Sequence, residues 1–385
     1  MIDPRRGEEI LFIPRIDNNH RVWLGHVPDA AESKRLYGFD RVLYADEAPA
    51  ALRRARKGYK RLYADSAATS RFRSELSGLA PRRARLQDCL EDLRAVKSPG
   101  ELALMKRAGE VSSRAHREVM KKTRPGMREY EVQAVFEAAC LREGLRLLAY
   151  PSIVAAGPNA AVLHYHRNDA LLGKDDLLLL DAGGEERGYA ADITRTFPAS
   201  GKFNRRQRDV YQIVLETQKA CIERARPGII SAELHVFSME KIAEGLKSIG
   251  LLKGDSSGLV ESGAVRMFYP HGLTHMLGLD VHDVTGGLRR VIPNPMKVHV
   301  RFVARLEPGF VITMEPGIYF IPALINDPAN RRRFRNSVNF SRVEKFLDFG
   351  GVRIEDDIVI RPQGTPENLT SAPKEIADVE EACGR

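Results

Sequence analysis

The stretch LLLLDAGGEERGYAADITRTF, residues 177–197, decides the fold class, because it places acidic side chains where strands are expected. The apolar run LLLL and the alternating run YAADITRTF predict two strands, with three glycines turning the chain between them. Asp181 ends the first predicted strand, and Asp192 lies inside the second. A buried carboxylate is costly unless it is paired or bound to a cation. The stretch therefore indicates either a cation site or two aspartates at a turn and a sheet edge.

A second segment further along the chain is rich in histidine. YPHGLTHMLGLDVHD (269–283) contains His271, His275 and His282, so three of the ten histidines fall within twelve positions. A lone histidine is more often an ordinary core residue, but a cluster of this density favours a functional site.

Two further apolar segments end on, or contain, acidic residues. Glu315 follows the apolar run FVITM and precedes a Pro-Gly pair, which should turn the backbone sharply out of a strand. In FGGVRIEDDIVI (349–360), Arg353 and Glu355 are two positions apart, so they should share one face of a single strand. The flanking isoleucines predict that this strand is buried, and Glu355 then needs a partner.

Together these segments supply four carboxylates and one imidazole: Asp181, Asp192, His275, Glu315 and Glu355. Four carboxylates close together in a medium of low dielectric would repel one another strongly, and two divalent metal ions would neutralise them. Oxygen-rich ligation with one nitrogen favours Mn²⁺, with Co²⁺, Fe²⁺ or Zn²⁺ as alternatives. The set contains no thiolate, which argues against a structural zinc site. Two metals that share carboxylates can also hold a bridging hydroxide, the nucleophile of metal-assisted hydrolysis.

The chain from residue 98 onward repeats one pattern. Helices are predicted over about 99–122, 129–144, 204–224 and 231–250. TRPG separates the first helix pair and ARPG the second, and the two RPG breaks lie 102 residues apart. Strand-rich sequence follows each pair. This matching order predicts an α+β domain of two similar halves, and ligand sites often form where two halves meet.

The residues before this repeat predict a separate small α/β domain over 1–95, leaving 96–385 for the catalytic domain. Short strands are predicted at 10–14, 21–27, 41–46 and 61–66. A helix and a linker are expected over 69–98, and Ser98 with Glu101 forms a capping signal for the next helix.

Composition excludes several classes of protein. The 385 residues include no apolar run near the ~20 residues that cross a bilayer, and the N-terminus lacks the apolar core of a secretory signal. The four cysteines are widely spaced, which is typical of thiols in a reducing cytoplasm. The net charge of +9 invites a nucleic-acid interpretation. Because no nucleic-acid-binding motif accompanies the basic clusters at 53–61 and 331–335, solvated surfaces are the favoured interpretation.

The sequence resembles the metallopeptidase family of methionine aminopeptidase, aminopeptidase P and prolidase, which has the pita-bread fold. The matching segments are HYHRND (164–169), DAGGEERGYAADITRTF (181–197), HGLTHMLGLDVHD (271–283), MEPGIYF (314–320) and GGVRIEDDIVI (350–360). They occur in the family's order over roughly residues 98–380. The resemblance implies a pita-bread (creatinase/methionine aminopeptidase-like) catalytic domain of two pseudo-symmetric halves behind the small α/β domain.

The resemblance also implies a role for each matching residue. Asp181 would bind one metal and His275 and Glu315 the other, with Asp192 and Glu355 bridging both. Glu315 would also act as the general base. The remaining roles are that His282 stabilises the tetrahedral intermediate, His271 and His164 line the substrate pocket, and Arg353 and Tyr319 support the ligands or the intermediate. Ordinary packing remains an alternative for His164 and Tyr319.

Within the family, the Xaa-Pro enzymes are the most similar, and EPGIYFIPALI followed by a polar insertion and FGGVRIED resembles prolidases in particular. The expected substrate is a small peptide with proline at the second position, and the expected reaction is hydrolysis of the bond before proline by the metal-bridging hydroxide. Arg301 matches the arginine that captures the substrate's C-terminal carboxylate in prolidases. Arg305 is a second candidate, and a solvated basic strand is the alternative.

Three further expectations concern alternatives and assembly. Aminopeptidase P, acting on longer peptides, is the alternative enzyme, and a peptide-binding pseudoenzyme is the alternative without catalysis. All five ligand positions are retained, which argues against the pseudoenzyme.

In the family, the N-terminal domain supports dimer contacts and closes one side of the pocket. We therefore expect a cytoplasmic homodimer with no membrane or nucleic-acid partner and with a shorter N-terminal domain than most relatives.

Overall fold

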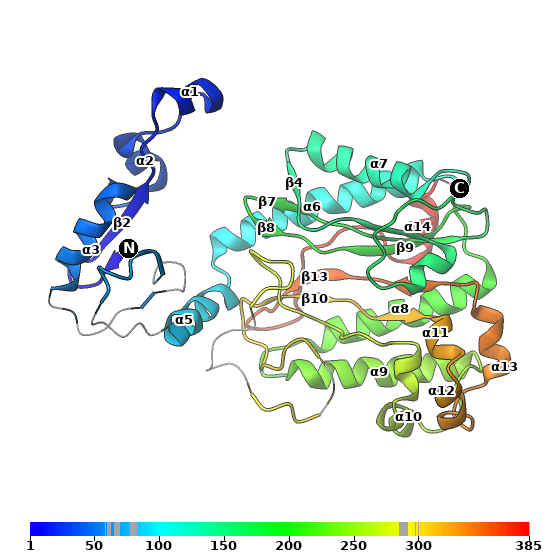
Figure 1. The fold of residues 1–385 in the computed structure, drawn as a ribbon. Coiled ribbons are helices and arrows are strands. Elements are labelled where there is room, and N and C mark those ends of the chain that lie inside the picture. Colours follow the sequence, from blue (N-terminus) through cyan, green and yellow to red (C-terminus); the bar gives the residue numbers. More distant parts are fainter. Residues whose placement is uncertain are drawn as a thin grey trace. The chain divides into compact units, whose positions relative to one another are not determined.

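The computed structural model describes residues 1–57, 59, 63–64, 70–77, 83–284, 292–296, 298 and 300–384 (Figure 1). The chain forms two compact units, Met1–Leu90 and Glu91–Arg385. Helix α5 (Arg83–Ala95) contains the division between them. In the described part of the chain, no helix combines the length and the apolar character needed to cross a bilayer.

The first unit contains a three-stranded sheet with short helices. Its strands are β1 (Ile2–Asp3), β2 (Glu8–Ile13) and β3 (Arg41–Tyr44). Strand β2 pairs antiparallel with β1 and parallel with β3, and the parallel pair confirms the predicted strands near 10–14 and 41–46. The helices are α1 (Asn18–Leu24), α2 (Ala30–Tyr37), η1 (Ala45–Glu47) and α3 (Ala48–Arg56).

Two of the predicted strands in this unit need comment. The strand predicted at 21–27 is wrong, because residues 18–24 form α1. The reason is a local cap: the Asp17 carboxylate accepts a hydrogen bond of 2.8 Å from the backbone N–H of His20, which starts a helix. Of the segment predicted at 61–66, only residues 63 and 64 are described, and they form no strand; the rest lies outside the described residues.

The second unit is built on two long helix pairs. These are α6 (Pro99–Lys122) with α7 (Glu129–Arg142), and α8 (Arg205–Arg224) with α9 (Ser231–Ser248), which confirms all four predicted helices. The predicted cap of α6 is also present, since the Glu101 carboxylate accepts from the Ser98 N–H at 2.7 Å while Ser98 Oγ accepts from the Glu101 N–H. In Figure 1 the strands of this unit run between the two helix pairs.

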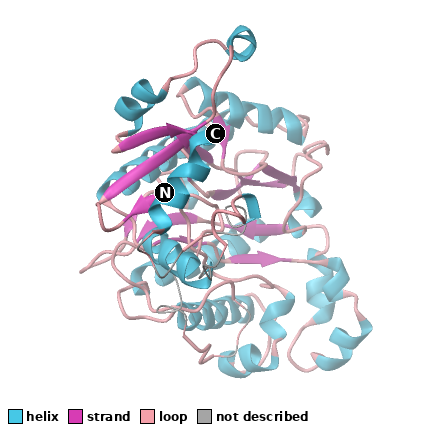
Figure 2. Cartoon of the chain, turned by 60° about the vertical axis from the view of Figure 1, so that its left-hand side comes forward, coloured by secondary structure: helices cyan, strands magenta, loops and turns pink. Residues whose placement is uncertain are grey.

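The strands of the second unit form small antiparallel sheets. They are β4 (Leu147–Leu148), β5 (Ile153–Ala156), β6 (Leu177–Asp181), β7 (Gly184–Glu186), β8 (Tyr189–Ala190), β9 (Thr194–Pro198), β10 (Val311–Met314), β11 (Gly317–Tyr319), β12 (Gly351–Arg353), β13 (Asp356–Val359) and β14 (Glu367–Asn368). The sheet orders are β5-β6-β9 and β4-β7-β8 in the first half, and β10-β13-β14 and β11-β12 in the second. Figure 2 shows these strands in magenta among the helices.

Short helices complete the second unit. They are η2 (Gly157–Ala161), α10 (Ser256–Ser262), η3 (Ala264–Met267), α11 (Pro322–Ile325), α12 (Pro328–Arg333), α13 (Phe340–Val343), η4 (Glu344–Phe346) and α14 (Ile376–Ala382). Several occur in the polar insertion between β11 and β12, so this insertion is folded rather than a bare loop.

The two halves repeat each other down to single hydrogen bonds. After the first RPG break, the Gly126 N–H donates to Leu172 O at 2.9 Å, and after the second, the Gly228 N–H donates to Leu306 O at 2.9 Å. Both glycines have φ near +90°, a conformation that favours glycine. The duplicated α+β architecture predicted from the two breaks is therefore present, and the fold is the pita-bread fold.

The two halves meet at the strands that hold acidic residues. The Glu355 N–H, between β12 and β13, donates to Thr194 O at the start of β9, with a distance of 3.0 Å. Two predictions about these strands were wrong in detail. Asp192 lies in the connection between β8 and β9, and the strand expected over 349–360 is interrupted at residues 354–355. Both carboxylates therefore lie outside the regular strands, close to the bridge between Thr194 and Glu355.

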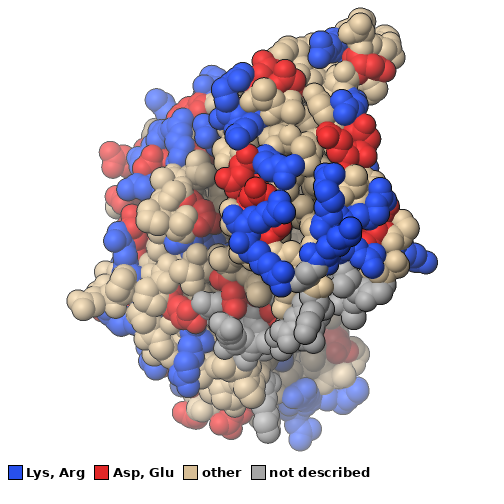
Figure 3. Space-filling model, turned by 90° about the vertical axis from the view of Figure 1, so that its left-hand side faces the viewer, with Lys and Arg blue, Asp and Glu red and all other residues tan. Residues whose placement is uncertain are grey.

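Charged side chains of both signs share the surface. Figure 3 shows Lys and Arg interspersed with Asp and Glu on one face. In the basic clusters singled out from the sequence, Arg53 pairs with Glu75 at 3.3 Å and Arg331 with Glu344 at 2.8 Å. These contacts fit solvated ion-paired surfaces, and the absence of a nucleic-acid partner stays a prediction.

Candidate metal centre and active site

The four predicted carboxylates and the imidazole all line one cavity of about 460 Å³. The first half supplies Asp181 from the end of β6 and Asp192 from the β8–β9 connection. The second half supplies His275 from the loop before β10, Glu315 from the end of β10, and Glu355 from the β12–β13 gap. The other predicted site residues on this wall are His164, His271, His282, Arg301 and Arg353.

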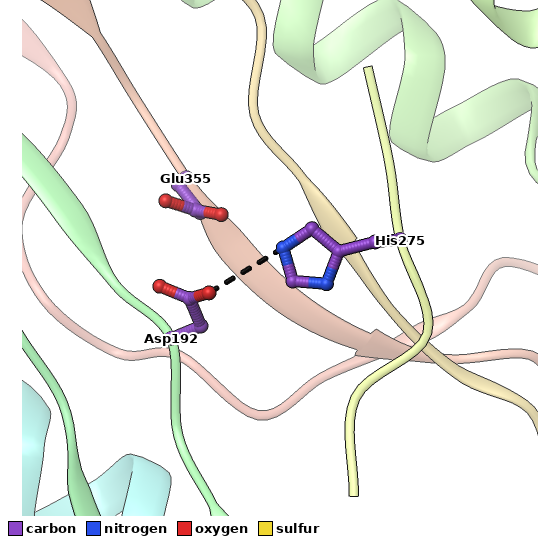
Figure 4. A group of neighbouring side chains, drawn as sticks. All are labelled: Asp192, His275 and Glu355. Carbon is purple, nitrogen blue, oxygen red and sulfur yellow. Dashed lines mark ion pairs between the residues drawn. The ribbon is translucent and has the colours of Figure 1, made fainter. Parts of the chain in front are cut away.

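Three of these residues form a compact cluster of metal-ligating atoms. One donor atom from each of Asp192, His275 and Glu355 lies within 4.8 Å of the others, and all three side chains are buried (Figure 4). The dashed line in Figure 4 marks the 3.4 Å separation between His275 Nε2 and Asp192 Oδ2. This spacing leaves room for a cation between the donor atoms.

The other two acids flank this cluster on opposite sides. Asp181 is linked to Asp192 through Tyr150, whose hydroxyl lies 2.6 Å from Asp181 Oδ1 and 2.7 Å from Asp192 Oδ1. Glu315 Oε1 lies 3.6 Å from His275 Nε2. The two oxygens of Asp192 have different partners, since Oδ1 faces Tyr150 and Oδ2 faces His275, as a carboxylate that bridged two cations would require.

The orientation of His275 suits a metal ligand. Its Nδ1 lies 3.0 Å from Met276 O, so this nitrogen carries the proton and donates it to the carbonyl. Nε2 faces the carboxylates of Asp192 and Glu315. Burial lowers the pKa of His275, but the hydrogen bond to Asp192 and the charges of Glu315 and Asp192 raise it overall, which favours a proton on Nε2 when no cation is bound. Metal-bound histidines almost always donate their other ring N–H to a carbonyl or carboxylate in this way. A bound cation would take the place of the Nε2 proton, and the freed lone pair would then coordinate it.

Electrostatics give a second reason for a cation here. Burial raises the pKa of Glu315 to about 7, although His275 partly opposes the shift. Burial, followed by the Asp192 and Glu315 carboxylates, raises the pKa of Glu355 well above its usual value. Burial also raises the pKa of Asp181. Burial also acts to raise the pKa of Asp192, but the hydrogen bonds from His275 and Tyr150 and the charges of His275 and Arg353 together lower it. The cluster resists full ionisation on its own, so divalent cations fit its donor set.

Local sequence explains how the two aspartates come together. Gly183 follows Asp181 by two positions, and a Cβ at Gly183 would lie 1.8 Å from Ala191 O, next to Asp192. Only glycine allows this close approach between the two segments. In the second half, the Pro-Gly pair after Glu315 ends β10 and starts β11, as its sequence predicts.

A hydrogen-bonded chain joins the pocket wall to the acids. His271 Nδ1 donates to Gly272 O at 2.8 Å, so Nε2 accepts from the Tyr319 hydroxyl at 2.8 Å. The Tyr319 hydroxyl in turn accepts from Arg353 NH1 at 2.9 Å, and Arg353 NH2 donates to Asp181 at 2.5 Å. Burial lowers the pKa of His271 to about 3, which keeps this ring neutral. The chain therefore fixes the His271 tautomer and holds Asp181 in place.

The remaining predicted residues surround the open side of the cluster. The His282 ring packs edge-on against His275, with ring centroids 4.5 Å apart, and burial lowers its pKa to about 4. His164 stacks on His166 with centroids 6.5 Å apart. Arg301 also lines the cavity and is exposed, whereas Arg305 is placed by its contact with Gly228 O at 3.1 Å. The roles given to these residues from the sequence stay predictions.

Sequence reasoning missed several residues of the site. Tyr150 contacts two of the acids, and the Thr194 hydroxyl donates to Glu355 Oε2 at 2.6 Å and accepts from Arg353 Nε at 3.0 Å. His166 also lines the cavity. Thr194 lies two positions after Asp192 in residues 177–197. Because side chains alternate between the two faces of a strand, the sequence could have placed Thr194 on the same face as Asp192. Tyr150 precedes a short apolar segment and gives no comparable signal.

The chain matches two family profiles. Residues 103–362 match metallopeptidase family M24, and residues 1–63 match the N-terminal domain of aminopeptidase P. The M24 match covers the four carboxylates, Asp181, Asp192, Glu315 and Glu355, and the imidazole of His275.

Named relatives and solved structures agree with these matches. A probable Xaa-Pro aminopeptidase from Podospora anserina is 40% identical over 98% of this chain and 82% of its own length. The human Xaa-Pro dipeptidase is 36% identical over 100% of this chain and 80% of its own length. The structure of zinc-substituted Escherichia coli aminopeptidase P in complex with product superposes on this chain with a TM-score of 0.83 and a sequence identity of 34%. The match covers 98% of this chain and 82% of that one.

Proposed function

The chain belongs to metallopeptidase family M24, and from this premise we propose that it is an Xaa-Pro dipeptidase. Its substrates would be dipeptides with proline at the second position, cleaved at the bond before proline. The observation that supports this choice is the guanidinium of Arg301, which lies on the same cavity lining as the acids. A guanidinium recognises a carboxylate through paired hydrogen bonds, and in a dipeptide the C-terminal carboxylate follows proline directly.

The proposed metal ligands are Asp181, Asp192, His275, Glu315 and Glu355, with Asp192 and Glu355 as bridging ligands. The oxygen-rich donor set favours two Mn²⁺ ions, with Co²⁺ or Zn²⁺ as alternatives. When bound, such ions lower the pKa of water and polarise the scissile carbonyl, which supplies a nucleophile at neutral pH.

The other residues would then bind the substrate and move protons. Glu315, whose pKa burial raises to about 7, is the proposed general base, which accepts a proton during attack and passes it to the proline nitrogen. His282 is the proposed hydrogen-bond donor to the scissile carbonyl. His271 is the proposed contact of the proline ring. Arg353, held by Tyr319 and Asp181, adds positive charge where negative charge develops.

Aminopeptidase P activity is the second candidate. It is favoured by the match of residues 1–63 to the aminopeptidase P N-terminal domain and by relatives named as Xaa-Pro aminopeptidases. That enzyme removes the first residue from Xaa-Pro-Yaa peptides, so its pocket must leave space beyond proline. The two candidates therefore differ in the length of the substrate.

We also propose a homodimer in the cytoplasm. Helix α1 buries no side chain within its unit, and Val22, Trp23 and Leu24 are exposed, which suits a surface that pairs with a second copy. The buried thiols of Cys140 and Cys221 fit a reducing compartment. Light scattering at several protein concentrations gives the mass, and a monomer throughout would reject the dimer.

The substrate test compares an Xaa-Pro dipeptide with the matching Xaa-Pro-Yaa tripeptide, each with and without added Mn²⁺. We expect kcat/KM to be at least about tenfold higher for the dipeptide, because a charge-assisted contact to its carboxylate contributes roughly 1.5–3 kcal/mol. Equal or better cleavage of the tripeptide would reject the dipeptidase in favour of aminopeptidase P. Metal-dependent cleavage of neither peptide would favour a peptide-binding protein without catalysis.

Replacing Arg301 by Ala tests the carboxylate contact. We expect KM for the dipeptide to rise about tenfold while kcat changes little, because the contact is present in both ground and transition states. Arg305→Ala is the matched control, since Arg305 contacts Gly228 O instead of lining the cavity. If Arg301→Ala leaves KM unchanged, or if Arg305→Ala raises KM equally, the assignment of Arg301 is wrong.

A further inference from the structure

The loop that holds His282 is closed on itself by backbone hydrogen bonds. The Asp283 N–H donates to Met276 O at 2.9 Å, and the Gly278 N–H donates to Asp280 O at 3.1 Å. The Ala190 N–H donates to Gly278 O at 2.9 Å, which ties the loop to strand β8. Within the described residues, the His282 ring makes no hydrogen bond and only packs against His275. The backbone of this loop therefore sets the point from which the exposed His282 side chain projects.

One end of the loop is fixed by a buried ion pair. Lys97 Nζ lies 3.3 Å from Asp283 Oδ2, and both side chains are 1% exposed. Arg94 NH2 lies 2.5 Å from Asp283 Oδ1 and 2.5 Å from Asp280 Oδ2, so it joins both acids of the loop. Charges this well buried are tolerated only when paired, and each partner holds the other in one geometry.

The packing around this pair leaves little freedom. A Cβ at Gly278 would lie 2.1 Å from Asp283 Oδ2 and 3.0 Å from Lys97 Cε. The Lys97 N–H donates to Gly309 O at 2.9 Å, just before β10, which carries Glu315 at its end. Lys97 thus joins the start of α6, the His282 loop and the approach to β10. Burial lowers the pKa of Lys97, and Asp283 opposes that shift.

From this geometry we propose that Lys97 and Arg94 are positioning residues for His282, acting through Asp283. The inference rests on the proposed function, because His282 is placed there beside the scissile carbonyl. Neither cation lines the cavity, so neither touches the substrate. Their effect is to hold the His282 backbone, and a displacement of about 1 Å in a catalytic group can cost on the order of a hundredfold in rate.

The test uses Lys97→Met, which removes the charge and keeps the length of the side chain. We expect kcat for an Xaa-Pro dipeptide to fall at least about tenfold while KM stays within about twofold. The matched control is Lys122→Met, at the other end of α6, where Lys122 forms an exposed pair with Glu118 at 2.6 Å. This control should keep the wild-type kcat.

A double variant separates positioning from general damage. If Lys97 acts through His282, adding Lys97→Met to His282→Ala should lower the residual kcat by less than about twofold, because the residue that it positions is already gone. An unchanged kcat in Lys97→Met, or the same loss in both backgrounds, would overturn the proposal. If Lys97→Met does not fold, Arg94→Gln repeats the test with the same criteria, since Arg94 is 29% exposed. Thermal unfolding of each variant checks folding, and a wild type without Xaa-Pro cleavage would instead contradict the proposed function.

Discussion

Replacing Glu315 by Gln is expected to lower kcat for Xaa-Pro dipeptides by about a thousandfold or more. The change removes a carboxylate next to His275 and the only side chain proposed as general base, and general acid–base catalysis alone contributes about 10²–10⁴-fold. Gln keeps the shape of the side chain, so the loss reports charge and proton transfer rather than packing. Steady-state kinetics with added Mn²⁺ measure the effect.

The matched control for this substitution is Glu244→Gln. Glu244 forms an exposed pair with Lys241 at 2.8 Å and lies outside the cavity. It should retain wild-type kcat and KM, because exposed ion pairs contribute little. Retention of more than about a tenth of the activity in Glu315→Gln would contradict its role as ligand and base.

Replacing Asp192 by Asn is expected to weaken metal binding by at least about a hundredfold and to abolish measurable turnover. Asp192 faces both sides of the cluster, so the loss of its charge affects two cation positions together. Changes to residues that only support metal ligands already cost about 10–100-fold in metal affinity or activity. Calorimetric titration of metal-depleted protein with Mn²⁺ measures the affinity, and hydrolysis measures the turnover.

Asp348→Asn is the control for Asp192→Asn. Asp348 pairs with Arg206 at 2.9 Å on the surface, and its replacement should leave metal binding unchanged. Wild-type metal affinity in Asp192→Asn would show that the cluster does not bind metal through Asp192.

Much of the larger unit could be predicted from local signals. The Ser98 cap and the two RPG breaks are short-range features, so helix ends and the duplicated halves follow from neighbouring residues. The gathering of the acids in one cavity was predictable for a similar reason, because an acid at the end of an apolar strand needs a partner. Asp181 and Glu315 lie where the sequence predicts them, at the ends of β6 and β10.

The errors arise where distant residues decide the local structure. Asp192 and Glu355 lie outside the regular strands, next to the bridge between Thr194 and Glu355 that joins the halves, and no nearby residue indicates that contact. Tyr150 and the Lys97–Asp283 pair were missed because their partners lie 31 or more positions away. The apolar residues of 18–24 suit a strand by composition, but the Asp17 cap starts a helix instead.

The most direct test is a metal count joined to an activity assay. Protein depleted of metal with EDTA is titrated with Mn²⁺, and bound metal per chain and dipeptide hydrolysis are measured at each step. We predict no hydrolysis in the depleted protein and full activity when two Mn²⁺ ions are bound per chain. Full hydrolysis in metal-depleted protein, or saturation without bound Mn²⁺, would contradict a dinuclear metallopeptidase.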